Sequence, residues 1–178
     1  MKNENLNEFH KLSELITKEM ILFPKGNKVI IENYENWTLE ITANWNSKRI
    51  DLTIKSRKSN LYSGFTECSI KKSSLISLIA RYDNYNLSGK KSMISDFLLS
   101  SPLSLNLLKC KKASFKLSGK YLIYNCRINC EGKDSLSNIF FLIEKVIAAI
   151  DKLTENKNVT QQSTVLKTQS NRMDSNLK

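Results

Sequence analysis

Hydrophobic positions recur along this chain with two different periods, and their order predicts a mixed α and β fold. Between residues 5 and 20 the apolar residues are three or four positions apart, which is typical of an amphipathic helix. The apolar positions of this helix are Leu6, Phe9, Leu12, Ile16 and Met20. Pro24 and Gly26 follow and are expected to end the helix.

The next three segments alternate between apolar and polar residues with a period of two, which predicts strands. They cover residues 28–34, 37–45 and 49–57. In the second segment every other residue is apolar, from Trp37 to Trp45. This pattern indicates half-buried antiparallel strands, with the tryptophans in the core.

The central part of the chain has weaker patterns. Residues 61–67 are interpreted as a loop or short strand, and a helix is expected from Ser73 or Ser74 to Arg81. A short extended segment over residues 82–87 and a second short helix over residues 92–100 complete this region.

A second hairpin is predicted around Ser118-Gly119, taken as a two-residue turn. This turn places Phe115 opposite Leu122 and Ala113 opposite Tyr124, so that apolar residues pair on the inner face. The outer face then carries a candidate surface for an anionic partner, formed by Lys112, Lys116, Tyr121 and Arg127.

A long amphipathic helix is predicted from about Asp134 to Leu153. Phe141 and Leu142 make its apolar stripe wider than one sheet face requires, so they are a candidate protein-partner edge for another helix or a second copy. The predicted fold class is therefore α+β, a mainly antiparallel sheet covered by an N-terminal helix and a long C-terminal helix. Residues 1–154 are expected to form one domain, and residues 155–178 a disordered polar tail.

The chain is strongly basic, with a formal net charge of +11 over 178 residues. The excess lies in the middle of the domain, where residues 21–132 carry eighteen Lys and Arg against eight Asp and Glu. Such charge is a property of many solvated surfaces and also of proteins that bind anionic partners.

Residues with catalytic or metal-binding chemistry are few. The chain has one histidine and four cysteines. Cys126 and Cys130 lie about 13 Å apart if both are on one strand, which is beyond the reach of a disulfide. No nucleophile, base and oxyanion set is recognised, so we expect no enzyme, no metal site and no cofactor, with all four cysteines reduced.

No apolar run approaches the roughly 18 residues of a transmembrane helix, and the N-terminus lacks the pattern of a signal peptide. A cytoplasmic location is therefore expected.

One group of short motifs carries a family resemblance: Tyr82-Asp83, Tyr85, Leu87-Ser88-Gly89, Leu98-Leu99 and Leu103-Ser104-Leu105. Together with the final strand pair and helix, residues 37–153 resemble the soluble domain of an uncharacterised family of membrane-tethered bacterial proteins. The resemblance implies a similar architecture and a binding role. It implies no catalytic residues, and the chain lacks the transmembrane segments typical of that family.

The sequence thus predicts a non-enzymatic cytosolic protein-interaction module, of an accessory, adaptor or immunity type. Its partner is expected to be a protein, and a homodimer is left open. The alternative is a module that binds nucleic acid or an anionic membrane through its basic sheet face.

Overall fold

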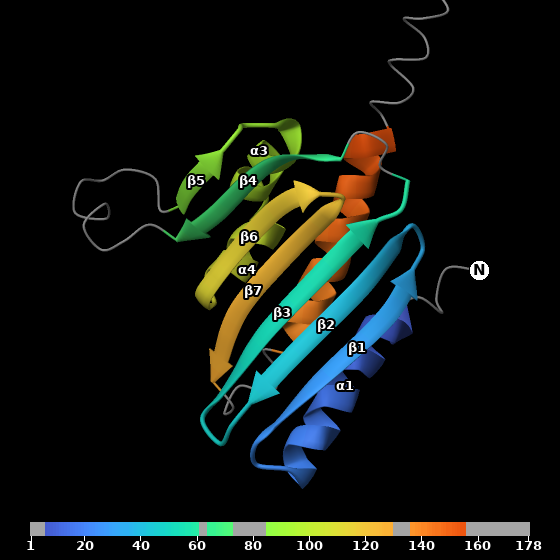
Figure 1. Ribbon diagram of the computed structural model, residues 1–178, viewed down its shortest axis with the longest axis vertical. Helices are drawn as coiled ribbons and strands as arrows, with labels where there is room; N and C mark the ends of the chain where they lie inside the picture. Colours follow the sequence, from blue (N-terminus) through green and yellow to red (C-terminus); the bar gives the residue numbers. More distant parts are fainter. Residues whose placement is uncertain (1–5, 61–63, 73–84, 130–135, 156–178) are drawn as a thin grey trace, which may run out of the picture.

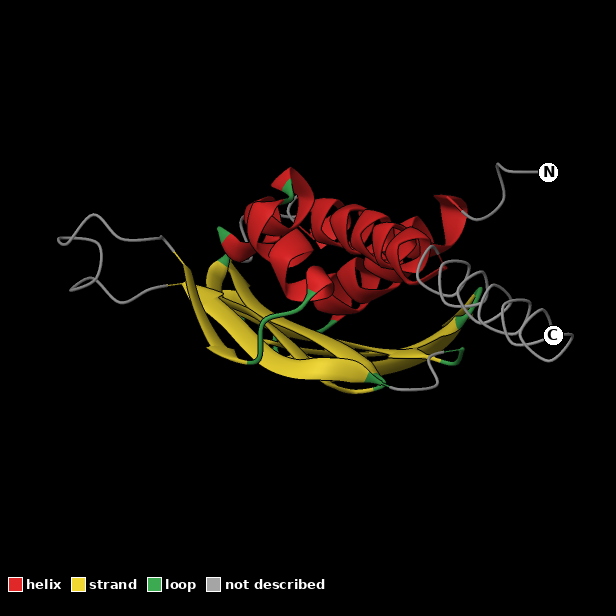
Figure 2. Cartoon of the chain, turned by 90° about the horizontal axis from the view of Figure 1, so that it is seen from above, coloured by secondary structure: helices red, strands yellow, loops and turns green. Residues whose placement is uncertain are grey.

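The described helices all lie on one face of a single antiparallel sheet, and the opposite face of the sheet is uncovered (Figure 2). This is the arrangement in the computed structural model, which describes residues 6–60, 64–72, 85–129 and 136–155. The predicted α+β fold class is confirmed.

The sheet has seven strands in the order β1-β2-β3-β7-β6-β4-β5 (Figure 1). The hairpin of β6 and β7 is inserted between β3 and β4, so the last two strands of the chain occupy the centre of the sheet. In spatial order the strands are β1 (Gly26–Tyr34), β2 (Trp37–Trp45), β3 (Arg49–Lys58), β7 (Tyr121–Asn129), β6 (Lys111–Gly119), β4 (Phe65–Lys72) and β5 (Tyr85–Gly89).

The helical layer contains α1 (Leu6–Leu22), α3 (Met93–Ser100), α4 (Pro102–Leu108) and a C-terminal helix over residues 136–155. Ser92 begins α3 with a reciprocal capping box formed with Ser95. Ser101 caps α4, whose first residue is Pro102. The predicted N-terminal, second short and C-terminal helices are confirmed, whereas α4 was not predicted.

The core lies between the sheet and the helices, where the inward residues of both predicted patterns meet. Phe9 of α1 packs edge-to-face on Tyr34 of β1 and also touches Phe140 of the C-terminal helix. On β6 and β7, Phe115 contacts Tyr124 at a ring-centroid distance of 5.0 Å. All of these side chains are buried, which confirms the predicted inward faces of the strands and helices.

The predicted register of the second hairpin is wrong by one turn position. The turn residues are Gly119 and Lys120, so that Leu117 pairs with Leu122 and Phe115 with Tyr124. Gly119 has φ +56°, the left-handed conformation that the first position of this tight turn requires and that glycine adopts without strain. Because the register differs by an even number of residues, each side chain keeps its predicted face.

The central segment also differs from prediction. Residues 65–72 form the strand β4, where a loop or short strand over residues 61–67 was expected. A shift of register between Phe65 and Cys68 interrupts the alternation at Thr66 and Glu67, which explains why the pattern was missed. The helix expected to end at Arg81 and the polar tail after residue 155 lie outside the described residues.

One ion pair is buried between the layers. Lys58, at the end of β3, points inward and pairs with Asp151 of the C-terminal helix. Trp37 of β2 donates from Nε1 to the other carboxylate oxygen of Asp151 at 2.9 Å. The Lys58 ammonium also lies 5.2 Å from the centre of the indole ring.

Replacing Asp151 by Asn should leave the buried Lys58 ammonium without a counter-charge, at a cost of about 3–5 kcal/mol in the free energy of unfolding. The double variant Lys58→Met with Asp151→Asn removes both charges and should recover most of that loss. Urea denaturation checks both values. Asp96→Asn is the control, because Asp96 pairs with Lys91 at the surface and should contribute at most about 1 kcal/mol. Equal destabilisation in the single and double variants would contradict the assignment.

Candidate functional site

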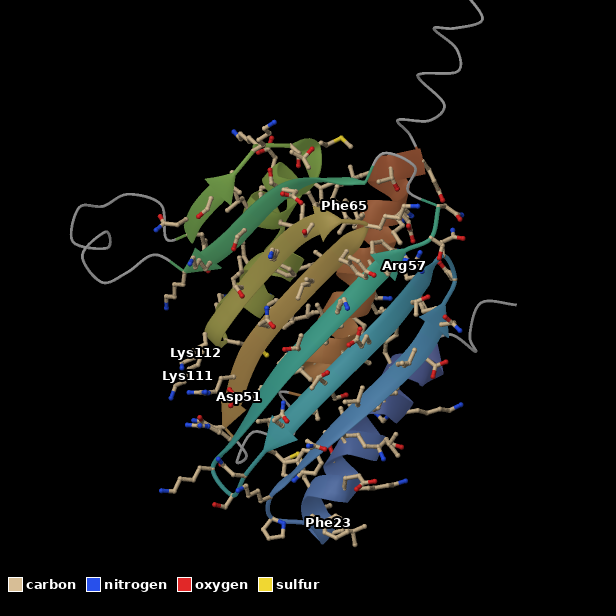
Figure 3. The ribbon with its side chains drawn as sticks, in the orientation of Figure 1. Phe23, Asp51, Arg57, Phe65, Lys111 and Lys112 are labelled. Atoms are coloured by element: carbon tan, nitrogen blue, oxygen red, sulfur yellow. The ribbon has the colours of Figure 1, made fainter. Side chains whose placement is uncertain are left out.

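The uncovered face of the sheet presents the outward residues of all seven strands, most of them polar (Figures 2 and 3). Across its centre the cross-strand neighbours are small and polar: Thr42 pairs with Thr53, Thr53 with Asn125, and Asn125 with Ser114. Thr53 donates to the Asn125 side chain at 2.8 Å. The centre of the open face is therefore a hydrogen-bonded polar surface with charged residues around it.

The structure places the four predicted residues of the basic surface on the same hairpin but spreads them along it. Tyr121 lies at the turn end, where it pairs with Ser118, and Lys116 lies opposite Ile123. Lys112 occupies a β-bulge at the other end of β6, with φ +54°, and points away from the sheet beside Lys111 (Figure 3). At about 3.3 Å per residue, the distance along the strand from Ser118 to Lys112 is roughly 20 Å.

The fourth predicted residue, Arg127, is held by a carboxylate. Its guanidinium donates from Nε and an Nη to the two oxygens of Asp51 at 2.6 and 3.1 Å. This bidentate bond from Arg127 lowers the pKa of Asp51, and the nearby charges of Arg49 and Lys112 act in the same direction. The charge of Arg127 is therefore largely compensated within the molecule.

Lys55 is also paired on this face. Its ammonium lies 2.9 Å from a carboxylate oxygen of Glu40, which raises the pKa of Lys55. The same ammonium lies 4.8 Å from the centre of the Tyr121 ring. The one aromatic side chain of the predicted basic surface thus already has a cation over it.

Five exposed cations on this side of the molecule have no carboxylate partner among the described residues. They are Lys71 of β4, Lys111 at the start of β6, and three further residues: Arg57, Lys112 and Lys116. Arg57 was not predicted as part of the surface, although it pairs directly across the sheet with Tyr121. Its outward phase on β3 was predicted, but the pairing of β3 with β7 was not. Arg57, Lys112 and Lys116 define what we call the free basic face.

Exposed hydrophobic side chains gather on a different part of the molecule. Of the eight large hydrophobic residues that are exposed in the described chain, six belong to α1, β1 or the turn between them. Three are consecutive at the end of α1, and we call them the α1-end patch: Ile21, Leu22 and Phe23, each between 54% and 70% exposed. Phe23 lies at the far end of the molecule from Phe65 (Figure 3).

A cavity of about 260 Å³ lies next to the α1-end patch. It is lined mainly by apolar side chains from α1, the turn after it, β2, β3 and the C-terminal helix: Met20, Ile21, Pro24, Trp45, Ile50 and Leu136. The turn is fixed by Trp45, whose Nε1 donates to the carbonyl of Phe23 at 2.9 Å. A Cβ atom at Gly26 would lie only 2.6 Å from the Trp45 ring, so only glycine fits there.

Only one of the two residues of the predicted protein-partner edge is exposed. Phe141 is 45% exposed, and the ammonium of Lys145 lies 5.2 Å from its ring centre. Leu142 is only 7% exposed, because it packs into the core of the chain itself. Phe141 alone therefore remains available on this edge.

Two cysteines far apart in sequence come together beside Tyr124. The Cys126 thiol is hydrogen-bonded to Cys110, and this bond lowers the pKa of Cys110 while raising that of Cys126. Burial raises the pKa of Tyr124, whose hydroxyl donates to the carbonyl of Leu107 at 2.8 Å. Cys68, Cys110 and Cys126 are free thiols, whereas Cys130 lies outside the described residues.

Within the part of the chain that the structure describes, no group of three or more His, Cys, Asp or Glu side chains could hold a metal ion. None of the helices described is both long and apolar enough to cross a membrane.

Comparison of the chain with protein-family models, with curated proteins and with solved structures finds no match. The resemblance to a membrane-tethered family therefore stays a prediction, and candidate functions rest on the surfaces described above.

Cys110 should react with iodoacetamide before Cys68 and Cys126, because it is the thiol with a lowered pKa and the only one of the three that is partly exposed. Cys126→Ala removes the hydrogen-bond donor and should slow the alkylation of Cys110 severalfold at neutral pH. Peptide mass spectrometry measures both rates. Cys68→Ala is the control and should change neither; an unaltered Cys110 rate in Cys126→Ala would refute the contact.

Proposed function

We propose that this protein is a non-enzymatic, cytoplasmic interaction module that recognises another protein through the α1-end patch and the cavity beside it. The observation that supports this proposal is a run of three consecutive exposed apolar residues, Ile21 to Phe23, of which Ile21 also lines an apolar cavity. Single exposed hydrophobic residues are ordinary, but a contiguous group beside a cavity is typical of an interaction site.

The cavity is close to the lower size limit of small-molecule sites. Small-molecule sites usually enclose about 300–1,000 Å³, and this cavity of about 260 Å³ lies just below that range. It is suited to one apolar side chain presented by a partner, with the α1-end patch covering the surroundings of that side chain.

The charges near the cavity indicate the chemistry of the partner. Lys25 lies two residues after the patch, and Lys48 lies in the turn whose Asn46 and Ser47 line the cavity. Both lysines are exposed and have no ion pair among the described residues. We therefore expect a partner that presents an apolar side chain flanked by carboxylates.

The test is affinity capture from the native host, with nucleic acid present and after its digestion, followed by measurement of Kd for the purified partner. The variant Ile21→Ser with Phe23→Ser should weaken binding at least about tenfold, since it removes an apolar anchor. Met93→Ser with Phe141→Ser is the matched control, because both residues are exposed hydrophobics outside the patch. Equal affinity of the patch variant and the wild type would contradict the proposal.

A second candidate function is the binding of nucleic acid or an anionic membrane through the free basic face. It is favoured by Arg57, Lys112 and Lys116, which are not compensated by described carboxylates. Their wide spacing and the single aromatic residue Tyr121 make it the weaker candidate, because single-strand binding relies on several stacking platforms and a continuous basic groove.

Replacing Arg57, Lys112 and Lys116 by Glu tests the second candidate without breaking the Arg127–Asp51 pair. We expect the wild type to bind DNA, RNA and anionic vesicles only weakly at physiological salt, and the variant to change this little. If all three residues contact phosphates, the slope of log affinity against log salt on duplex DNA should instead fall by about 3 in the variant. Fluorescence anisotropy over a salt series distinguishes these outcomes; tight, salt-sensitive binding lost in the variant would promote this function.

A further inference from the structure

The outer edge of β1 is an open strand edge whose charged residues are Lys28 and Glu32, both on its inward side. β1 is nine residues long and ends the sheet, so its outer side has no strand partner among the described residues. Its open-face residues include Val29 and Ile31, which are 58% and 69% exposed. Its pairing with β2 is continuous from Gly26 to Tyr34, without a bulge or a proline. Natural edges of this kind are usually covered, charged or bulged, because they otherwise pair with another strand.

The sequence of β1 is complementary to itself about its central residue, Ile30. If two copies of β1 pair in antiparallel orientation with Ile30 opposite Ile30, residues whose numbers sum to 60 become cross-strand neighbours. Lys28 then faces Glu32 of the second copy, and Val29 faces Ile31, each twice by symmetry. Opposite charges and β-branched pairs at such positions both stabilise a sheet.

The helical layer next to this edge is also apolar. Glu19 of α1 pairs with Lys28 of β1 at 2.9 Å, which places that side of α1 toward the edge strand. Leu15 and Leu22 lie four residues before and three residues after Glu19, so they share its side of the helix. Both are exposed, and α1 runs beside β1 behind the sheet (Figure 1).

We propose that the protein forms a two-fold symmetric homodimer in which β1 pairs with β1 of a second copy, joining the two sheets into one. The second copy is favoured over a foreign strand because β1 itself supplies both members of each complementary pair. In the dimer, Val29 and Ile31 are covered on the open face, and Leu15 of the two α1 helices lies toward the two-fold axis in the helical layer.

Charge reversal tests this register. Sedimentation equilibrium of the full-length protein should give a dimer, and Glu32→Lys should weaken it at least about tenfold, because two attractive pairs become repulsive. Lys28→Glu should do the same, and because it also breaks the pair of Lys28 with Glu19 of α1, its effect on the fold is measured separately by melting. An equimolar mixture of the two variants should form a heterodimer with an affinity near that of the wild type, since each Lys again faces a Glu. Circular dichroism melting monitors the fold of each variant.

A second pair of variants locates the interface without changing these charges. Val29→Lys with Ile31→Lys should give a monomer, whereas the control Met93→Lys with Phe141→Lys should remain dimeric. A monomeric wild type at submillimolar concentration would overturn the proposal, as would a mixture of charge variants that stays monomeric. Dissociation by the control alone would move the interface to the helices. The α1-end patch variant Ile21→Ser with Phe23→Ser leaves β1 intact and should still dimerise, so the two proposals fail independently.

Discussion

The buried pair of Lys58 and Asp151 is the constraint on which the arrangement of this fold depends. Two charges between a sheet and a helix are stable only when each has its partner, so the C-terminal helix has one position relative to β3. Trp37 donates to the same carboxylate, and Phe65 stacks on the indole at 6.2 Å. Of these two partners of Trp37, Asp151 binds the last residue of β3, and Phe65 is the first residue of β4. Lys58 also donates its backbone N–H to the carbonyl of Lys120 in the β6–β7 turn. The pair therefore fixes where the late hairpin and the final helix meet the first three strands.

Because the helices cover only one face, β2, β3, β6 and β7 are apolar inward and mostly polar outward, and the outward face must satisfy its own charges. The edge strand β1 departs from this pattern, with Val29 and Ile31 outward. The outward face satisfies its charges by pairing across neighbouring strands, both within the β2–β3 hairpin and between β3 and β7, which are distant in sequence. Arg127 of β7 is held by Asp51 of β3, and Lys55 of β3 by Glu40 of β2. The strong net charge of the chain is thus a poor measure of the charge that an incoming ligand would meet. What remains uncompensated on the open face is a small set of separated cations, among them Arg57, Lys112 and Lys116.

The alternation from Trp37 to Trp45 and the helical stripe ending near Leu153 sufficed to predict most elements and their inward faces, because burial imposes those periods directly. The turn at Gly119 was misplaced because Ser118-Gly119 and Gly119-Lys120 give the same face pattern, and only the pairing of Ser118 with Tyr121 separates them. The sequence predicted which side of the sheet the candidate basic residues face. It did not predict that Asp51 compensates the charge of Arg127, since that pair depends on β3 lying next to β7, which local sequence does not encode. Lys58 did carry a signal: it falls on the inward phase of its strand, where a lysine needs a buried partner.

The two edges of the sheet differ in strand length and in the number of exposed hydrophobic side chains. At one edge, β5 is only five residues long, is followed along the chain by the helices α3 and α4, and presents Asn86 and Ser88. At the other, β1 is nine residues long and, with α1, holds six of the eight large exposed hydrophobic side chains described. The core needs none of these six, since the inward residues of α1 and β1 already fill their side of it. Their solvation is a cost that folding alone leaves unexplained, and it is relieved when another surface covers the α1 and β1 side of the molecule. The α1 and β1 edge is therefore the part of this chain best suited to bind another surface, and the open sheet face beside it remains in contact with solvent.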